Sequence, residues 1–153
     1  MSTNLSSGNT TTAVGYEALK ALTTGNSNTA FGYQSQTANV DGEANVSFGR
    51  ATLGTNVSGN HNTAIGHQAA RDMRLGSYNV FYGSYAGMNG CSGSKNTAVG
   101  MNCMEQNTVG NQNTAVGTRA LVNSTTADNN TAVGNDALKL NTTGTRNVAV
   151  GAI

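Results

Sequence analysis

Hydrophobic and polar residues alternate in one short segment that recurs along the whole chain. The segment has the form Asn-Thr-Ala-Val-Gly, and its copies begin at residues 11, 28, 45, 62, 79, 96, 113, 130 and 147. We number the positions of the repeat from the first residue of this segment. Threonine or valine at position two and an aliphatic or aromatic residue at position four flank a small residue at position three in eight of the nine copies. Alternation with period two predicts a short β-strand at positions two to four of every copy.

The spacing of the copies predicts how these strands are arranged. Each copy starts 17 residues after the one before, and nine units account for all 153 residues. A fixed short period lets equivalent residues stack at the strand spacing of roughly 4.8 Å. Residues 16–22 (YEALKAL) would suit a helix, but the equivalent segments RATLGTN and SYAGMNG contain poor helix formers. We therefore expect one all-β domain over residues 1–153, a parallel β-solenoid of nine 17-residue turns with no linker or cap.

Asparagine and glycine form columns that would act as structural ladders. Position one is Asn in eight of nine copies, and stacked amides can hydrogen-bond along the axis. Position five is always Gly, and position fifteen is Gly in every unit but one, from Gly8 to Gly144. These two columns predict two corners that need positive φ or close backbone approach. The predicted ladder residues are Asn28, Asn45, Asn62, Asn79, Asn96, Asn113, Asn130, Asn147, Gly15, Gly32, Gly49, Gly66, Gly83, Gly100, Gly117, Gly134 and Gly151.

The alternation also suggests which side chains face the interior. Positions two and four carry the larger side chains, so we expect them to line a thin core together with the small residues of position eight. Position three and the Leu or Met of position nine would then face outward and form a lateral interface, while positions ten to fourteen would form a loop. The oligomer interface predicted in this way consists of Phe81, Leu19, Leu53, Leu121 and Leu138.

Residues 79–83, NVFYG, depart most from the repeat because Phe81 and Tyr82 replace smaller side chains. The interpretation that we favour is internal packing, with Tyr82 inside the roll and Phe81 against neighbouring chains. The alternative is a surface that binds a glycan or a cell-surface receptor, since aromatic faces beside polar groups suit such contacts. The residues of that predicted surface are Arg71, Arg74, Tyr78 and Tyr85.

Composition and charge narrow the range of partners. The chain has 20 Gly and no Pro, and its charged residues make up 10% of the sequence, compared with about 25% in average proteins. A net charge of +1 gives no reason to expect nucleic acid as a partner. No apolar run is long enough to cross a bilayer, so we expect no membrane insertion.

No group of residues in the sequence predicts catalysis. His61 and His67 occupy different columns of the repeat, as do the only cysteines, Cys91 and Cys103. A metal site or a disulfide would need these side chains to converge. We therefore expect no enzymatic activity, no metal and no cofactor.

The segments NTAVGYEAL and NVAVG resemble the head repeats of trimeric autotransporter adhesins and the related repeats of phage and algal-virus tail fibres. The resemblance covers the whole chain and lies in the Asn, Ala, aliphatic and Gly columns. It implies a left-handed parallel β-roll, a homotrimer about a common axis, an extracellular, cell-surface or virion location, and a role in attachment. The adhesin heads usually have a shorter period, so their ligand preferences are not transferred.

These observations predict a structural and adhesive fibre segment, a stiff rod that displays loops for attachment to a cell or surface. One alternative is the protomer of an extracellular filament that assembles end to end. A less favoured alternative is an ice-binding solenoid, because threonine ladders on flat solenoids can order water. Val46, Val80 and Val148 interrupt the threonine column at position two, which we also expect to face the interior.

Overall fold

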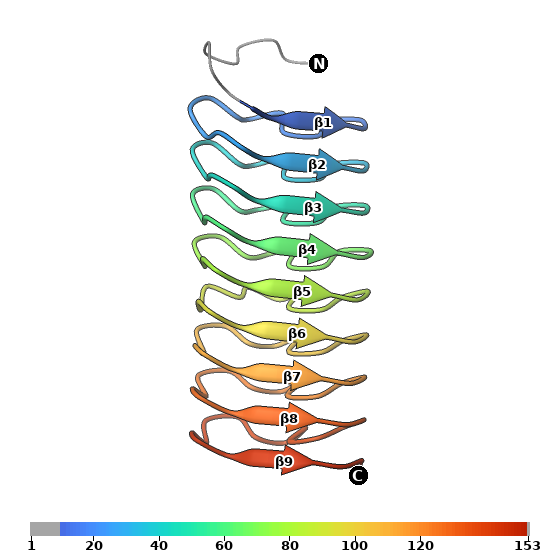
Figure 1. The fold of residues 1–153 in the computed structure, drawn as a ribbon, viewed down its shortest axis with the longest axis vertical. Coiled ribbons are helices and arrows are strands. Elements are labelled where there is room, and N and C mark those ends of the chain that lie inside the picture. Colours follow the sequence, from blue (N-terminus) through green and yellow to red (C-terminus); the bar gives the residue numbers. More distant parts are fainter. Residues whose placement is uncertain (1–9, 153) are drawn as a thin grey trace.

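The computed structural model describes residues 10–152 and shows an all-β rod in which each turn of chain lies on the next (Figure 1). Over this range nine parallel strands form one sheet in chain order, and Thr12 pairs with Thr29, one 17-residue repeat later. The predicted parallel β-solenoid is confirmed. We number the turns by their strands, which are β1 (Thr12–Val14), β2 (Thr29–Phe31), β3 (Val46–Phe48), β4 (Thr63–Ile65), β5 (Val80–Tyr82), β6 (Thr97–Val99), β7 (Thr114–Val116), β8 (Thr131–Val133) and β9 (Val148–Val150).

The asparagines of position one form a buried ladder along the rod. The Oδ1 atom of Asn28 accepts a hydrogen bond of 3.0 Å from the backbone N–H of Asn45 in the next turn. The Nδ2 atom of Asn28 donates to the carbonyl of Gly42 at 2.7 Å. The same pair of bonds recurs up to Asn130. An amide can donate and accept at once, so each Asn closes its own turn and binds the next.

The glycines of position five are required by both conformation and space. Their φ angles run from 129° at Gly66 to 143° at Gly32, a region that side-chain-bearing residues rarely adopt. A Cβ atom at Gly32 would also overlap the carbonyl group of Gly49 in the next turn. Gly8 of the second predicted glycine column lies outside the described residues.

Positions seven, nine and seventeen bend the chain with left-handed residues other than glycine. In the first turn these are Glu17, Leu19 and Ser27, with φ angles of 55°, 51° and 57°. The same three positions have positive φ in the following turns as well. Residues other than glycine are uncommon at positive φ. Positions seven, nine and seventeen therefore mark additional corners of each turn, which the glycine columns did not predict.

The side chains of position three, and not those of positions two and four, point into the core. Phe81 is fully buried, whereas Tyr82 is 56% exposed and Phe48 is 54% exposed. The predicted orientation of the strands, with Tyr82 inside and Phe81 outside, is therefore wrong. The interior is so narrow that an alanine fits best opposite the side chains of positions eight and nine, and the larger residues of position four stand outside.

The side chains of position nine also lie in the core of the single chain. Leu19, Leu53 and Leu121 are buried, and Leu138 packs against the main core cluster. The predicted oligomer interface of these four residues and Phe81 is wrong, because the fold of one chain already covers four of the five and partly covers Leu138.

Position twelve is a further buried column within the segment that was expected to be a loop. It carries Leu22 and Met73 in two turns and Asn in four others. The Oδ1 atom of Asn39 accepts from the N–H of Gly42 at 2.8 Å, and its Nδ2 atom donates to the carbonyl of the same glycine at 3.2 Å. We call this two-bond contact the asparagine clasp. It recurs at Asn56 and Asn107.

Candidate interaction surfaces

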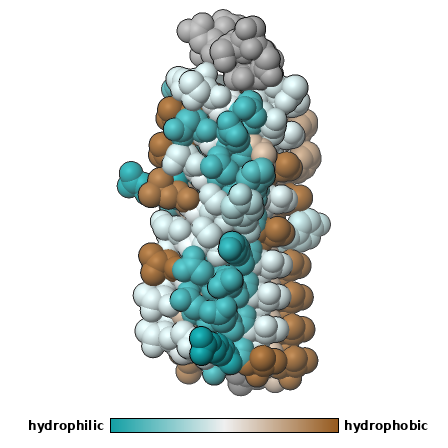
Figure 2. Space-filling model, turned by 60° about the vertical axis from the view of Figure 1, so that its left-hand side comes forward, coloured by the Kyte–Doolittle hydropathy of each residue, from teal (hydrophilic) through white to brown (hydrophobic). Residues whose placement is uncertain are grey.

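The outward side chains of positions two and four form one flat surface over the nine described strands, which we call the outer sheet face. Figure 2 shows hydrophobic side chains in a column along this side of the rod. The rings of Phe31 and Phe48 stack at 4.7 Å with an angle of 5° between their planes. None of the residues at these two positions is charged. The face therefore offers an extended, uncharged and largely apolar surface.

A second surface lies just past the glycine corner, at position six of the first four turns and position seven of the fifth. Tyr16 and Tyr33 stack there at 5.3 Å, and the guanidinium carbon of Arg50 lies 5.6 Å from the centre of the Tyr33 ring. The Nη1 atom of Arg50 is 3.3 Å from Nε2 of His67, whose ring meets the ring of Tyr85 edge-on at 5.2 Å. We call these five residues the corner column.

The corner column occupies only the first part of the rod. In later turns position six carries Ser84, Met101, Thr118 and Asn135, which are neither aromatic nor charged. This column was not predicted, because only the core and corner positions show a clear pattern in all nine repeats. Tyrosine at position six of two consecutive repeats was the available signal.

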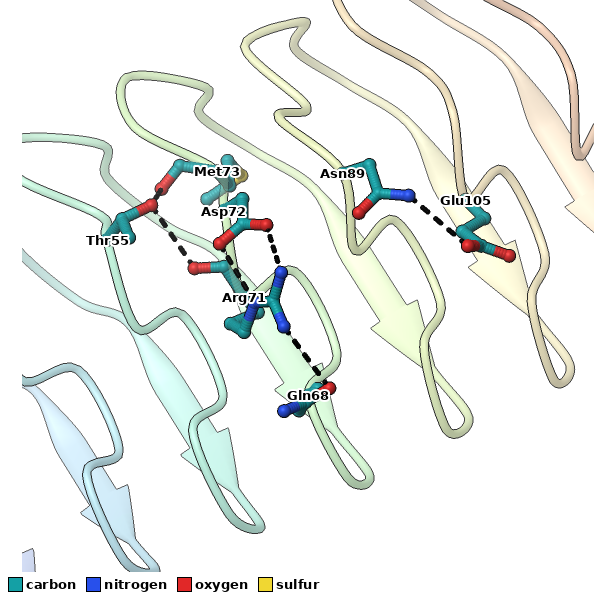
Figure 3. A network of polar contacts seen from close by, with 7 residues as sticks. All are labelled: Thr55, Gln68, Arg71, Asp72, Met73, Asn89 and Glu105. Atoms are coloured by element: carbon teal, nitrogen blue, oxygen red, sulfur yellow. Dashed lines mark hydrogen bonds and ion pairs between the residues drawn. The ribbon is translucent and has the colours of Figure 1, made fainter.

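The four residues of the predicted surface site have different contacts. Arg71 is held by Asp72 and by a hydrogen bond to Gln68 (Figure 3). The hydrogen bonds that Arg71 donates to the Asp72 carboxylate raise the pKa of Arg71, so this guanidinium already has a carboxylate partner. Tyr85 belongs to the corner column, while Tyr78 stacks on His61 at 5.0 Å. Arg74 is exposed, and a shared ligand for all four residues stays a prediction.

Polar contacts also connect the outer loops of successive turns (Figure 3). The hydroxyl of Thr55 donates to the backbone carbonyls of Arg71 and Met73, both at 3.2 Å. Asn89 donates to the carboxylate of Glu105 at 3.2 Å. These contacts fix the loops on the rod, so their side chains are displayed at a regular axial interval.

The cysteines and histidines do not form a reactive centre in the described part of the chain. Cys91 and Cys103 are free and buried, and burial raises the pKa of both thiols to about 12. The Cys103 thiol donates to the carbonyl of Ala115 at 3.3 Å. Within residues 10–152 no three His, Cys, Asp or Glu side chains are placed to hold a metal ion.

No family model, curated protein or solved structure matches the chain. No helix in residues 10–152 is long and apolar enough to cross a membrane. Proposals about function therefore depend on the geometry of the rod and its two surfaces.

Proposed function

We propose that the chain is a structural segment of an adhesive fibre, located outside the cell or on a virion. The observation that carries this proposal is the unbroken register of nine parallel strands, each held to the next by strand pairing and, from β2 to β9, by a buried asparagine. Stacking of this kind gives a rod of about 43 Å at the usual strand spacing. Such a rod spaces its loops at one-turn intervals, as attachment to an extended surface requires.

Association of three chains through the outer sheet face completes the proposal. The face measures about 43 Å by about 10 Å, taking nine strands of three residues at standard dimensions. Uncharged apolar patches above a few hundred Å² commonly mark protein interfaces. Phe48 is 54% exposed on this face, so a neighbouring chain would cover it. Apart from Phe31, Phe48 and Tyr82 the face consists of β-branched side chains, which allow close packing between chains.

Sedimentation of the purified chain tests this association. We expect a trimer, and we expect Phe48→Asp to give monomers with an unchanged β circular dichroism spectrum, because a carboxylate would be placed in an apolar interface. Leu140→Asp is the control, since Leu140 is 80% exposed but lies outside the outer sheet face. A monomeric wild-type chain at ~0.1 mM would contradict the proposal, which assumes at least micromolar affinity. Long filaments in negative-stain images would support the end-to-end alternative.

One observation favours ice binding as a second candidate. The threonine column of position two was expected inside the roll, but it lies on the outer sheet face, and β6, β7 and β8 carry the same outward pair of Thr and Val. A regular flat array of this kind can order water. Thermal hysteresis that is present in the wild-type chain and lost in Thr114→Lys would establish ice binding by the outer sheet face.

A further inference from the structure

The corner column is a continuous series of contacts that runs along the axis of the rod. Neighbouring members of the column lie 5.3 Å apart at Tyr16 and Tyr33 and 5.6 Å apart at Tyr33 and Arg50. His67 extends the series to Tyr85 in the fifth turn. Each of the first four turns therefore contributes one polar-tipped side chain from position six, and the fifth turn contributes Tyr85 from position seven.

The stacking decides which parts of these side chains a ligand can reach. Tyr33 has Tyr16 on one side and Arg50 on the other, so its ring faces are occupied. Tyr16 and Tyr33 are nevertheless 63% and 44% exposed, which leaves ring edges and hydroxyl groups for a partner. Side chains that are held by their neighbours lose little further freedom on binding.

The cation of the column has no carboxylate partner. The ion pairs of the described residues involve Lys20, Arg71, Arg119 and Lys139. Arg50 has none of them and instead contacts the Tyr33 ring and the His67 imidazole. Its remaining N–H groups are available to oxygen atoms of a ligand.

We propose that the corner column binds an extended polysaccharide that lies parallel to the rod, with one sugar beside each turn. Sugars in an extended β-1,4-linked chain advance by a distance close to the interval between the turns. Their hydroxyl groups can accept hydrogen bonds from the guanidinium and donate to the tyrosine oxygens. This inference rests on the adhesive part of the proposed function and names the class of its ligand.

The matching of intervals also predicts where binding stops. Position six beyond His67 carries Ser84, Met101 and Thr118, so the polar aromatic series does not continue along the later turns. A coiled polysaccharide would leave the column after one or two sugars. Length and linkage of the sugar chain are therefore the decisive variables.

Calorimetric titration with cello-oligosaccharides from cellobiose to cellohexaose tests the inference. We expect the affinity to rise with each added sugar until the ligand covers the column from Tyr16 to Tyr85, and then to level off. Maltohexaose has the same number of sugars in a curved α-linked chain. We expect it to bind roughly tenfold more weakly than cellohexaose, because the curved chain would lose one or two hydrogen bonds to the column. Equal affinity for the two hexasaccharides, or no binding of cellohexaose, would overturn the inference.

Variants locate the site on the column. Tyr33→Ala and Arg50→Ala should each weaken cellohexaose binding roughly tenfold, the size of effect seen at central contact residues. Tyr33→Phe should retain the ring stack and lose only the contribution of the hydroxyl. Leu140→Ala is the control, because Leu140 is 80% exposed and lies outside the column and outside the other predicted surface. An equal loss in Leu140→Ala would refute the assignment of the site.

Two further measurements separate this inference from the proposed function. Sedimentation and negative-stain imaging of Tyr33→Ala should show the same assembly and the same rod as the wild-type chain, since Tyr33 lies outside the outer sheet face. Intact trimers that bind no cellohexaose would refute the polysaccharide site alone. Monomers that bind it with the expected length dependence would refute the trimer alone.

Discussion

The core departs from its pattern of small and aliphatic residues in two regions, one polar and one aromatic. In the second and third turns the hydroxyls of Ser35 and Ser47 are 2.6 Å apart, and Gln36 donates to Ser47 at 2.8 Å. Thr52 completes the group at 3.0 Å from Ser35. This buried network separates the apolar cluster of the first two turns from the main apolar cluster.

The aromatic exception lies in the fifth turn, where Phe81 takes the place of the usual alanine. Gly87 stands opposite at position nine, where most turns have Leu or Met. A Cβ atom at Gly87 would overlap the ring of Phe81, so the aromatic side chain occupies the space of the missing one. The total volume is preserved although both residues change.

The comparison shows that a column tolerates an exception when the facing column changes with it. The aromatic exception is compensated within one turn, by volume. The polar exception is compensated across two turns, by hydrogen bonds that leave none of its members unsatisfied. Three predictions test this difference, beginning with the largest effect.

Gly87→Leu restores the common residue at position nine and should be strongly destabilising. The new side chain would overlap Phe81 in a filled core, at a cost of about 3 kcal/mol in the free energy of unfolding. Phe81→Ala should be destabilising on its own by a similar amount because it leaves a cavity. The double variant recreates the usual pair and should unfold in urea close to the wild-type midpoint. Additive losses in the double variant would mean that the two positions are independent.

Ser47→Ala removes a shared partner from the polar network and should cost about 1–2 kcal/mol, since it leaves buried polar atoms with fewer hydrogen bonds. Combining it with Ser35→Ala and Gln36→Leu returns the region to an apolar core, and we expect most of the loss to be recovered. Ser92→Ala, at an exposed serine, should leave the urea midpoint unchanged. If the triple variant is less stable than Ser47→Ala, apolar packing cannot replace the polar network of the second and third turns.

The smallest effect concerns Ser124, whose buried hydroxyl has no hydrogen-bond partner among the described residues. It occupies position twelve in the turn that has Ala127 in place of glycine at position fifteen. A Cβ atom at Gly42 or Gly110 would overlap the Oδ1 atom of the asparagine clasp, so Asn and Ala exclude each other at these positions.

Ser124→Asn alone should therefore destabilise the rod, while Ser124→Asn with Ala127→Gly should complete the clasp. Two added hydrogen bonds predict a gain of about 1 kcal/mol over the wild-type chain. A double-mutant cycle from thermal unfolding measures the coupling. A coupling energy near zero would show that Ala127 does not explain the short side chain at Ser124.

These pairs also show what the sequence could and could not predict. The fixed period and the Asn and Gly columns were sufficient for the parallel solenoid, because each column depends on contacts between equivalent residues. Period-two alternation defines two faces of a strand but not which face is inside. The larger side chains pointed to the wrong face, since the interior has room for Ala30 but not for Phe31.

The candidate surfaces were predictable only in part. Tyr85 was identified from the sequence, but Arg71 is engaged by Asp72 and Tyr78 contacts His61. The corner column depends on contacts between residues one repeat apart, such as Tyr16 and Tyr33, which a linear search for clusters overlooks. Position twelve escaped notice because Asn39 and Met73 differ in polarity yet fill the same buried place.

The aromatic exception lies within one turn of the rod, whereas the polar exception extends over two. This difference affects how such a rod can gain or lose turns. Recombination between repeats removes or duplicates whole turns, and the Asn ladder joins any turn to any other. Loss of the fifth turn would remove Phe81 and Gly87 together, so neither residue would be left without its partner. Loss of the third turn would remove Ser47 and leave Ser35 and Gln36 without it. Removing the fifth turn would therefore leave no unpaired change in the core, whereas the polar network stays satisfied only when the second and third turns are kept or removed together.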